Sequence, residues 1–113
     1  MSQITTHVLD TSLGSPAEGI KISLERSLDG EKWEEITSGV TDSDGRILNF
    51  IPEDQEIPIG IYRMIFNTRS YFERRNIMGF YPEVPVVFEI TNTDHYHIPL
   101  LLSPYGYSTY RGS

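Results

Sequence analysis

Three histidines and one arginine are the residues of this 113-residue chain best suited to chemistry. His95 and His97 form an H-x-H pair, and His7 lies near the start of the chain. Imidazole holds or releases a proton near neutral pH, so His7 and His97 can supply a general base that activates water and an acid or orienting group. Arg46, a permanent cation, can hold a developing oxyanion. Together these groups suit hydrolysis of a planar, electron-poor ring.

The same histidines also permit a metal site. Residues two apart on a strand point to the same side, so His95 and His97 have a spacing found in zinc and copper sites. With His7 as a third ligand, they could hold a hydrolytic zinc ion that lowers the pKa of bound water. No carboxylate has an evident place as a further ligand, and the chain has no cysteine. We therefore predict no metal and keep the zinc hydrolase as an alternative.

Arg46 follows the segment Thr41-Asp42-Ser43-Asp44-Gly45. This segment is similar to the start of a calcium loop, but the later ligands, including a terminal Glu, do not follow. A tight turn is the better interpretation, and it places Arg46 at a rigid position from which the guanidinium can offer two donors to a carboxylate, enolate or urea-like edge. The alternative is an exposed arginine at a strand start. No serine hydrolase elbow, cysteine nucleophile, phosphate-binding glycine loop or dinucleotide fingerprint is present in the sequence.

The composition limits the possible classes. A chain of this length, with 38% hydrophobic residues, fits one compact domain with a core of its own, and the absence of cysteine excludes a disulfide scaffold. The net charge of -7 argues against a nucleic-acid partner, because such binding depends on Lys and Arg. No apolar run approaches the roughly 20 residues that span a bilayer, and Met1 to Asp10 does not resemble a signal peptide. We expect no membrane association and a cytoplasmic location.

Short β-rich runs separated by Gly, Pro, Asn and Asp clusters are typical of a β-sandwich. The expected strands are Ile4 to Leu9, Ile20 to Ser27, Trp33 to Thr41, Arg46 to Phe50, Ile61 to Asn67, Val84 to Thr91, His95 to Leu102 and Tyr107 to Arg111. Asp29-Gly30 and Asp44-Gly45 are expected as hairpin turns, because Gly accepts a positive φ. Ser12 to Glu18 and Pro52 to Pro58 are expected as loops.

One helical window lies between Asn67 and Gly79. Thr68 or Ser70 is a suitable N-cap, and Gly79 is a suitable C-terminal residue. Glu73, Arg74 and Arg75 are expected to form a solvated helix face, where ion pairs contribute little.

Alternation along the first and seventh runs separates a core face from an outer face. The core face should carry Ile4, Thr6, Val8, Tyr96, Ile98, Leu100 and Leu102. The outer face should carry Thr5, His7, Leu9, His95, His97, Pro99 and Leu101. This outer face is partly apolar, as is common where another subunit covers it. Pro99 has no N–H, so we expect it at a bulge or on a free edge.

Several motifs resemble those of the transthyretin-related 5-hydroxyisourate hydrolases. The similar segments are Thr5 to Ser12, Gly14 to Ala17, Thr41 to Arg46 and His95 to Ser113. The most specific is the terminal Tyr110-Arg111-Gly112-Ser113, which closes the chain as it does in that family. True transthyretins share the Val-Leu-Asp and Leu-Leu-Ser-Pro-Tyr segments but lack this ending and the histidine positions. The resemblance therefore implies a hydrolase and not a hormone carrier.

Membership implies that residues 1–113 form a single transthyretin-like (prealbumin-like) hydrolase domain, an all-β, eight-stranded, two-sheet sandwich with one short helix. It also implies a homotetramer, a dimer of dimers, with active sites where the dimers meet. The catalytic residues of the family correspond to His7, Arg46 and His97, and the substrate-binding tail to Tyr110, Arg111, Gly112 and Ser113. His95 has no role that the resemblance supplies.

The implied reaction opens the six-membered ring of 5-hydroxyisourate at an amide carbonyl. The product is 2-oxo-4-hydroxy-4-carboxy-5-ureidoimidazoline, an intermediate of urate degradation, and no cofactor is required. On this hypothesis His97 activates water, Arg46 stabilises the oxyanion and His7 positions substrate or water. Besides the zinc hydrolase, the alternatives are a binding module that only holds a ligand in the tetramer channel and a structural sandwich without chemistry.

Overall fold

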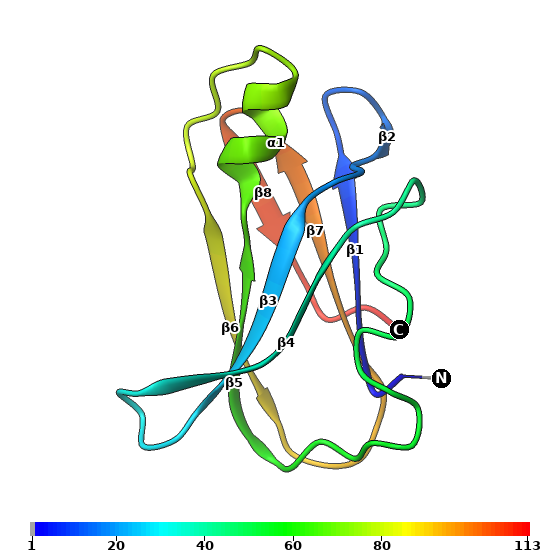
Figure 1. Ribbon diagram of the computed structural model, residues 1–113, viewed down its shortest axis with the longest axis vertical. Coiled ribbons are helices and arrows are strands. Elements are labelled where there is room, and N and C mark those ends of the chain that lie inside the picture. The colour runs from blue at the N-terminus through cyan, green and yellow to red at the C-terminus, as the bar shows by residue number, and fades with distance from the viewer. Residues whose placement is uncertain (1) are drawn as a thin grey trace.

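Two four-stranded sheets pack face to face in the computed structural model, which describes residues 2–113 (Figure 1). One sheet has the strand order β2-β1-β7-β8 and the other β4-β3-β5-β6. The elements are β1 (Ile4–Asp10), β2 (Ser15–Pro16), β3 (Lys21–Ser27), β4 (Trp33–Val40), β5 (Gly60–Phe66), α1 (Thr68–Arg74), β6 (Val84–Ile90), β7 (Tyr96–Ser103) and β8 (Gly106–Thr109). The predicted all-β sandwich with one short helix is confirmed.

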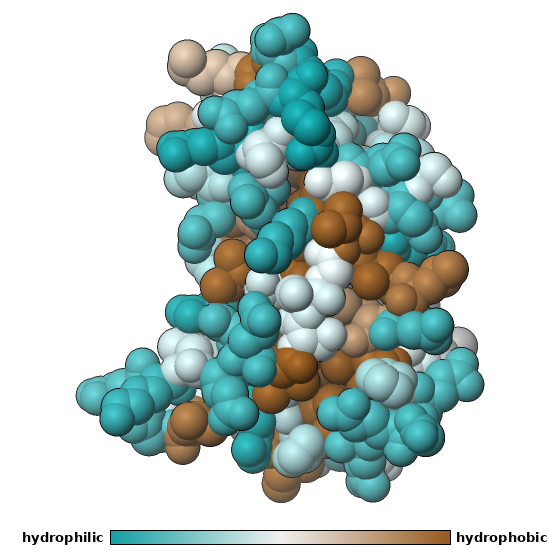
Figure 2. All heavy atoms as spheres, in the orientation of Figure 1, coloured by the Kyte–Doolittle hydropathy of each residue, from teal (hydrophilic) through white to brown (hydrophobic). Residues whose placement is uncertain are grey.

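The core lies between the sheets and follows the predicted alternation. Ile4, Thr6 and Val8 of β1 are buried, as is every second residue of β7 from Tyr96 to Leu102. Tyr62, Met64 and Phe66 of β5 are fully buried and contribute to the same core from the opposite sheet. Figure 2 shows hydrophobic side chains reaching the surface along the middle of one face, while its upper end is mostly hydrophilic. Among the described residues, no helix is long and apolar enough to cross a membrane.

The fourth predicted strand, Arg46 to Phe50, is not formed. Only Arg46 makes a strand-like pairing, an antiparallel bridge to His7. Asn49 has a φ of 56°, which is incompatible with an extended strand, and Leu48 is exposed. Asp44-Gly45 is a tight turn as predicted, but it leads from β4 to the edge of the other sheet and so does not form a hairpin. Asp29-Gly30 does join the antiparallel pair β3 and β4.

The segment Ser12 to Glu18 is not entirely a loop, because it contains the two-residue strand β2. Ser15 and Pro16 pair with the end of β1 at the edge of the sheet. A proline fits there, since an edge strand has one side without ladder bonds. The other predicted loop, Pro52 to Pro58, contains no helix or strand.

Pro99 lies in an interior strand, which corrects the prediction of a bulge or a free edge. It pairs in regular register with His7 of β1, and β8 flanks β7 on the other side. The β7–β8 ladder begins only at Leu100 opposite Thr109, so Pro99 lies just beyond its end. The ladder with β8 therefore does not require an N–H from this residue, and the Pro99 carbonyl accepts a hydrogen bond from the Thr109 hydroxyl at 2.7 Å.

The helix exists where it was predicted, but both predicted ends were wrong. Asn67 is the N-cap and makes no side-chain cap bond, while the Thr68 hydroxyl donates to the Tyr81 carbonyl at 2.6 Å. The helix ends at Arg74, well before Gly79, and Asn76 takes the left-handed conformation with a φ of 56°. Asn accepts this conformation more readily than most residues, so it ends the last turn in place of glycine.

Glu73 and Arg74 are exposed, as the predicted solvated helix face requires, but Arg75 is not part of such a face. Arg75 forms an ion pair of 2.8 Å with Asp10, whose side chain is 0% exposed, and Arg74 donates to the Gly19 carbonyl. Asp10 also accepts hydrogen bonds from the Tyr71 hydroxyl at 2.7 Å and from Ser12. Burial by itself raises the pKa of Asp10, but the hydrogen bonds from Ser12 and Tyr71 outweigh it and the pKa is lowered.

Asp10→Asn should lower the free energy of unfolding by about 1.5–3 kcal/mol, because an amide cannot accept all the hydrogen bonds that the buried carboxylate accepts from Arg75, Tyr71 and Ser12. Urea unfolding at neutral pH measures this change. Since the pKa of Asp10 is lowered, its contribution is present above the ordinary carboxyl pKa and is lost as the pH falls through the folded value. Glu25→Gln, which removes the partly exposed pair with Arg63, should cost about 1 kcal/mol or less. An equal loss of unfolding free energy in the two variants would contradict the conclusion that the buried carboxylate of Asp10 stabilises the fold more than the partly exposed pair of Glu25 and Arg63.

Candidate active site

One sheet brings the separate sequence motifs side by side. β1 and β7 are parallel neighbours, with Thr5 opposite His97 and His7 opposite Pro99. Outside β1 lies Arg46, bridged to His7, and outside β7 lies Gly112, bridged to His97. The start, middle and end of the chain therefore meet on the outer face of this sheet.

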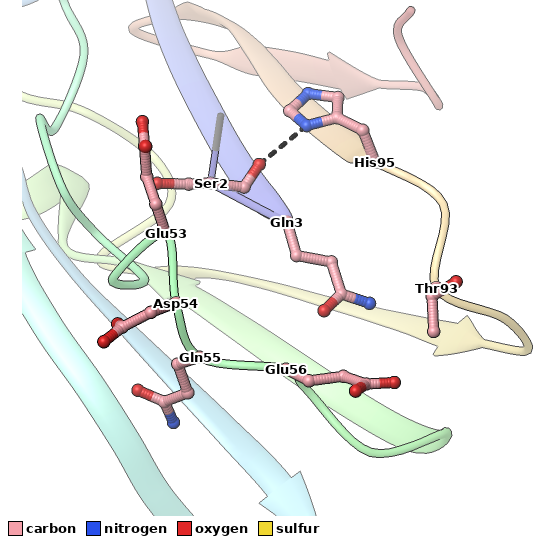
Figure 3. Close-up of a pocket in the computed structure, with 8 residues that line it drawn as sticks. All are labelled: Ser2, Gln3, Glu53, Asp54, Gln55, Glu56, Thr93 and His95. Atoms are coloured by element: carbon pink, nitrogen blue, oxygen red, sulfur yellow. Dashed lines mark hydrogen bonds between the residues drawn. The ribbon is translucent and has the colours of Figure 1, made fainter.

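A cavity of about 640 Å³ opens on this face, within the range of small-molecule sites. We call it the His97 cavity. It is lined by Ser2, Thr5, Thr6, Arg46, Ile47, Leu48, Asn49, Glu53, His95, His97 and Ser113. Two imidazoles and one guanidinium thus border the same space. A second hollow shares Ser2, Glu53 and His95 with this cavity, and the contact between the His95 ring and the Ser2 carbonyl lies in its wall (Figure 3).

Arg46 is held by the turn that precedes it. The Asp42 carboxylate accepts from the backbone N–H of Asp44 at 2.8 Å and from that of Arg46 at 3.1 Å. Gly45 has a φ of 74°, and its carbonyl accepts from the N–H of Val8 at 2.9 Å. A Cβ at position 45 would lie 2.5 Å from the Val8 carbonyl oxygen, so glycine is required. The tight turn was predicted from the sequence, and the structure adds that it fixes the backbone of Arg46 against β1.

His97 is half-buried and lies beside Thr5 and His95. Its Nδ1 is 2.8 Å from the Thr5 hydroxyl, and the same hydroxyl is 3.0 Å from His95 Nε2. The two rings are nearly parallel, with centroids 6.4 Å apart. The pKa of His97 is lowered, first by burial and then by the positive charge of Arg46 and by His95 and His7. A lowered pKa keeps this imidazole neutral at neutral pH, as a general base requires.

His7 is the one predicted catalytic residue that is not among those lining the His97 cavity. It is half-buried on the same face of β1 as Thr5, and it is close enough to His97 to help lower the pKa of that residue. The cavity thus has Arg46 and His97 on its wall, with His7 beside them.

A model of the HIUase/Transthyretin family matches residues 4–112. The chain belongs to this family. A Salmonella dublin 5-hydroxyisourate hydrolase is 50% identical over 111 residues, covering 97% of this chain and 80% of that protein. The solved Klebsiella pneumoniae 5-hydroxyisourate hydrolase superimposes with a TM-score of 0.85 at 38% identity, over 100% of this chain and 94% of the other. Sea bream transthyretin in complex with thyroxine superimposes with a TM-score of 0.90 at 33% identity, over 97% of this chain and 94% of the transthyretin chain.

In this member of the HIUase/Transthyretin family, the C-terminal tail divides between two cavities. The Gly112 N–H donates to the His97 carbonyl at 2.8 Å, and Ser113 lines the His97 cavity. Tyr110 and Arg111 line a different cavity of about 270 Å³, where the guanidinium lies 4.3 Å from the centroid of the Tyr96 ring. Of the four tail residues, the structure places only Gly112 and Ser113 beside His97.

Sequence reasoning left His95 without a role and gave none to Thr5. Alternation had already placed both on the same face as His97, but their contact depends on the register of β1 against β7. As for the zinc alternative, no three His, Cys, Asp or Glu side chains between residues 2 and 113 are grouped so that they could hold a metal ion. The resemblance implies catalytic roles for His7 and His97, and these roles stay predictions.

Proposed function

We propose that this chain hydrolyses 5-hydroxyisourate to 2-oxo-4-hydroxy-4-carboxy-5-ureidoimidazoline in urate degradation. The observation that carries the proposal is the convergence of Arg46, His97 and Ser113 on one cavity, with His7 beside it. These residues come from distant parts of a chain whose relatives include 5-hydroxyisourate hydrolases. A protein that only bound a planar ligand would not need a neutral imidazole and a guanidinium in the same cavity.

In the proposed reaction, a water oxygen attacks an amide carbonyl of the six-membered ring. His97 takes a proton from this water, and Arg46 donates to the carbonyl oxygen as negative charge develops on it. His7 positions water or substrate. The C–N bond then breaks, and the proton held by His97 passes to the leaving nitrogen. One water is consumed, and the product has a new carboxyl group and an open ureido chain, without a cofactor.

The terminal residues Tyr110 to Ser113 complete the proposed substrate-binding surface. Ser113 lines the His97 cavity directly, and Gly112 places it there through its bond to the His97 carbonyl. The contact of Arg111 with Tyr96 anchors the tail against the sheet. Tyr110, which is 57% exposed, is available to contact substrate or a neighbouring subunit.

We also propose a homotetramer, a dimer of dimers, with the His97 cavity facing a neighbouring subunit. Support comes from large apolar side chains that are exposed in one chain, including Leu48 at 79% beside the cavity and Val87 at 60% on the edge strand β6. Burying such side chains favours association. Gel filtration with light scattering tests the assembly. The proposed location remains the cytoplasm.

The test of the activity is the ultraviolet decay of freshly generated 5-hydroxyisourate, corrected for its spontaneous breakdown. At micromolar protein we expect an accelerated decay that saturates with substrate. Chelator-treated protein should be equally active. An unchanged decay rate would favour the binding module, and loss of activity on chelation with recovery on adding zinc would favour the metal alternative.

Gly112→Ala should lower kcat/KM by roughly 10-fold or more while leaving the fold intact. A Cβ at this position would lie 2.6 Å from Cδ2 of His97, so either the ring or the tail must move. The hydroxyisourate assay and thermal unfolding measure the two effects. Gly106→Ala is the matched control, because its Cβ would meet only the Ser103 hydroxyl at 3.7 Å. Equal activities for the two variants would show that the close approach of Gly112 does not position His97.

A further inference from the structure

We propose that Thr5 and His95 are positioning residues that fix the proton of His97 on Nδ1 and leave Nε2 free as the base. The proposal deepens the function proposed above and rests on it for its kinetic consequence. The assignment of the proton itself rests only on the hydrogen bonds of the free protein.

The first step is the contact between His95 and Ser2. His95 Nδ1 lies 2.8 Å from the Ser2 backbone carbonyl oxygen, the contact dashed in Figure 3. A carbonyl oxygen only accepts hydrogen bonds, so His95 Nδ1 must carry a proton. In a neutral imidazole the other nitrogen then has none, and His95 Nε2 is an acceptor.

The second step is the Thr5 hydroxyl, which lies 3.0 Å from His95 Nε2 and 2.8 Å from His97 Nδ1. A hydroxyl has one proton to donate and lone pairs with which to accept. Because His95 Nε2 is an acceptor, Thr5 must donate to it. Thr5 therefore accepts from His97, and His97 Nδ1 carries a proton.

These hydrogen bonds determine the protonation of Nε2 of His97, the nitrogen proposed as the base. A neutral His97 with its proton on Nδ1 has an unprotonated Nε2, which can take a proton from water. The three hydrogen bonds all point the same way: His97 donates to Thr5, Thr5 donates to His95, and His95 donates to the Ser2 carbonyl. The Ser2 carbonyl sets this direction because it can only accept. If His95 were protonated, its Nε2 would donate to Thr5, the hydroxyl would turn towards His97 Nδ1, and His97 Nε2 would carry the proton instead.

The pairing of β1 with β7 holds these groups in place. Thr5 is opposite His97 in the parallel pairing of β1 and β7, and His95 lies on the same outer face just before β7. Thr5, His95 and His97 are all half-buried and line the His97 cavity. The groups that influence the pKa of His97 are the Arg46 guanidinium and the titratable imidazoles of His95 and His7. The cavity wall also carries Glu53 and the terminal residue Ser113.

The decisive experiment is two-bond ¹H–¹⁵N NMR on the ring nitrogens of His97, which distinguishes the protonated from the unprotonated nitrogen. In the unmodified protein near neutral pH we expect the proton on Nδ1. Thr5→Val keeps the shape of the side chain but removes the hydroxyl, and it should abolish this preference. Thr5→Ser should restore it. A His97 proton on Nε2 in the unmodified protein, or a spectrum unaffected by Thr5→Val, would overturn the proposal.

The kinetic readout is kcat/KM for 5-hydroxyisourate, which should fall roughly 10- to 100-fold in Thr5→Val and recover in Thr5→Ser. His95→Leu should act like Thr5→Val, whereas His95→Gln offers an amide oxygen to Thr5 and should retain more activity. Thr11→Val is the matched control, because the Thr11 hydroxyl also links the ends of β1 and β7, through the Leu102 carbonyl, but lies outside the cavity. Thr11→Val should change neither the NMR spectrum of His97 nor kcat/KM. If the protein did not hydrolyse 5-hydroxyisourate at all, the proposed function would fail while the NMR result still decided the protonation of His97.

Discussion

His97→Asn should lower kcat/KM for 5-hydroxyisourate by roughly 10²–10⁴-fold, the usual contribution of a general base. Asparagine is close in size and keeps a polar group near Thr5, but it cannot take a proton from water. His97 is the imidazole that both lines the cavity with Arg46 and has a lowered pKa, so no nearby group is equally prepared to replace it. The loss should be mainly in kcat, because the substitution removes chemistry and leaves the other cavity walls in place.

The measurement is the hydroxyisourate decay assay on purified variants of equal oligomeric state. Glu34→Gln, an exposed change on β4 of the other sheet, serves as the control and should be fully active. Thermal unfolding of His97→Asn should stay close to that of the unmodified protein. A folded His97→Asn variant with unchanged kcat would remove His97 from the mechanism and leave His7 and His95 as the imidazoles available for the role.

The pH dependence of the unmodified enzyme gives an independent check. Because burial and the neighbouring positive charge lower the pKa of His97, its neutral form dominates at and above pH ~6.5, the ordinary histidine value. Activity should therefore be retained at neutral pH and fall as the pH drops through the lowered pKa. This acidic limb should be absent from the residual activity of His97→Asn.

Much of the site was accessible from the sequence because strand alternation is a local rule. It places His7 and His97 on outer faces without knowledge of which strands are neighbours, and the structure has both residues there. The motif that ends in Arg46 likewise predicts a tight turn from Asp and Gly alone. The core faces of β1 and β7 follow from the same periodicity.

What the sequence could not supply was the register between segments far apart in the chain. That Thr5 meets His95 and His97 depends on β1 lying parallel to β7, about ninety residues away, and no local signal encodes this pairing. The same holds for Arg75, which has the local pattern of an exposed helix residue yet pairs with a buried aspartate on β1. Pro99 was predicted at a bulge or on a free edge because it has no N–H for a ladder bond. It lies instead in an interior strand, which is possible because the ladder between β7 and β8 begins only at the next residue.

Arg46→Ala should lower kcat/KM by roughly 10²–10³-fold, corresponding to the loss of one oxyanion donor worth about 3–4 kcal/mol. Arg46 brings a positive charge to a cavity that it shares with the unprotonated base. Removing it takes away the stabilisation of the carbonyl oxygen in the transition state, and it also raises the pKa of His97 towards the ordinary value. The acidic limb of the pH profile should thus move to higher pH in the same variant that loses activity.

These two effects separate a catalytic Arg46 from one that only shapes the cavity. Arg46→Lys keeps the charge but loses the planar pair of donors, so it should retain the pH profile of the unmodified protein and recover only part of kcat. Arg69→Ala, an exposed arginine on the helix outside the cavity, should change neither quantity. If Arg46→Ala moved the pH profile while kcat at high pH stayed unchanged, the guanidinium would act on His97 alone, and the oxyanion would need another donor. A uniform loss at every pH, with the profile unmoved, would instead place Arg46 on the substrate and too far from His97 to influence its proton.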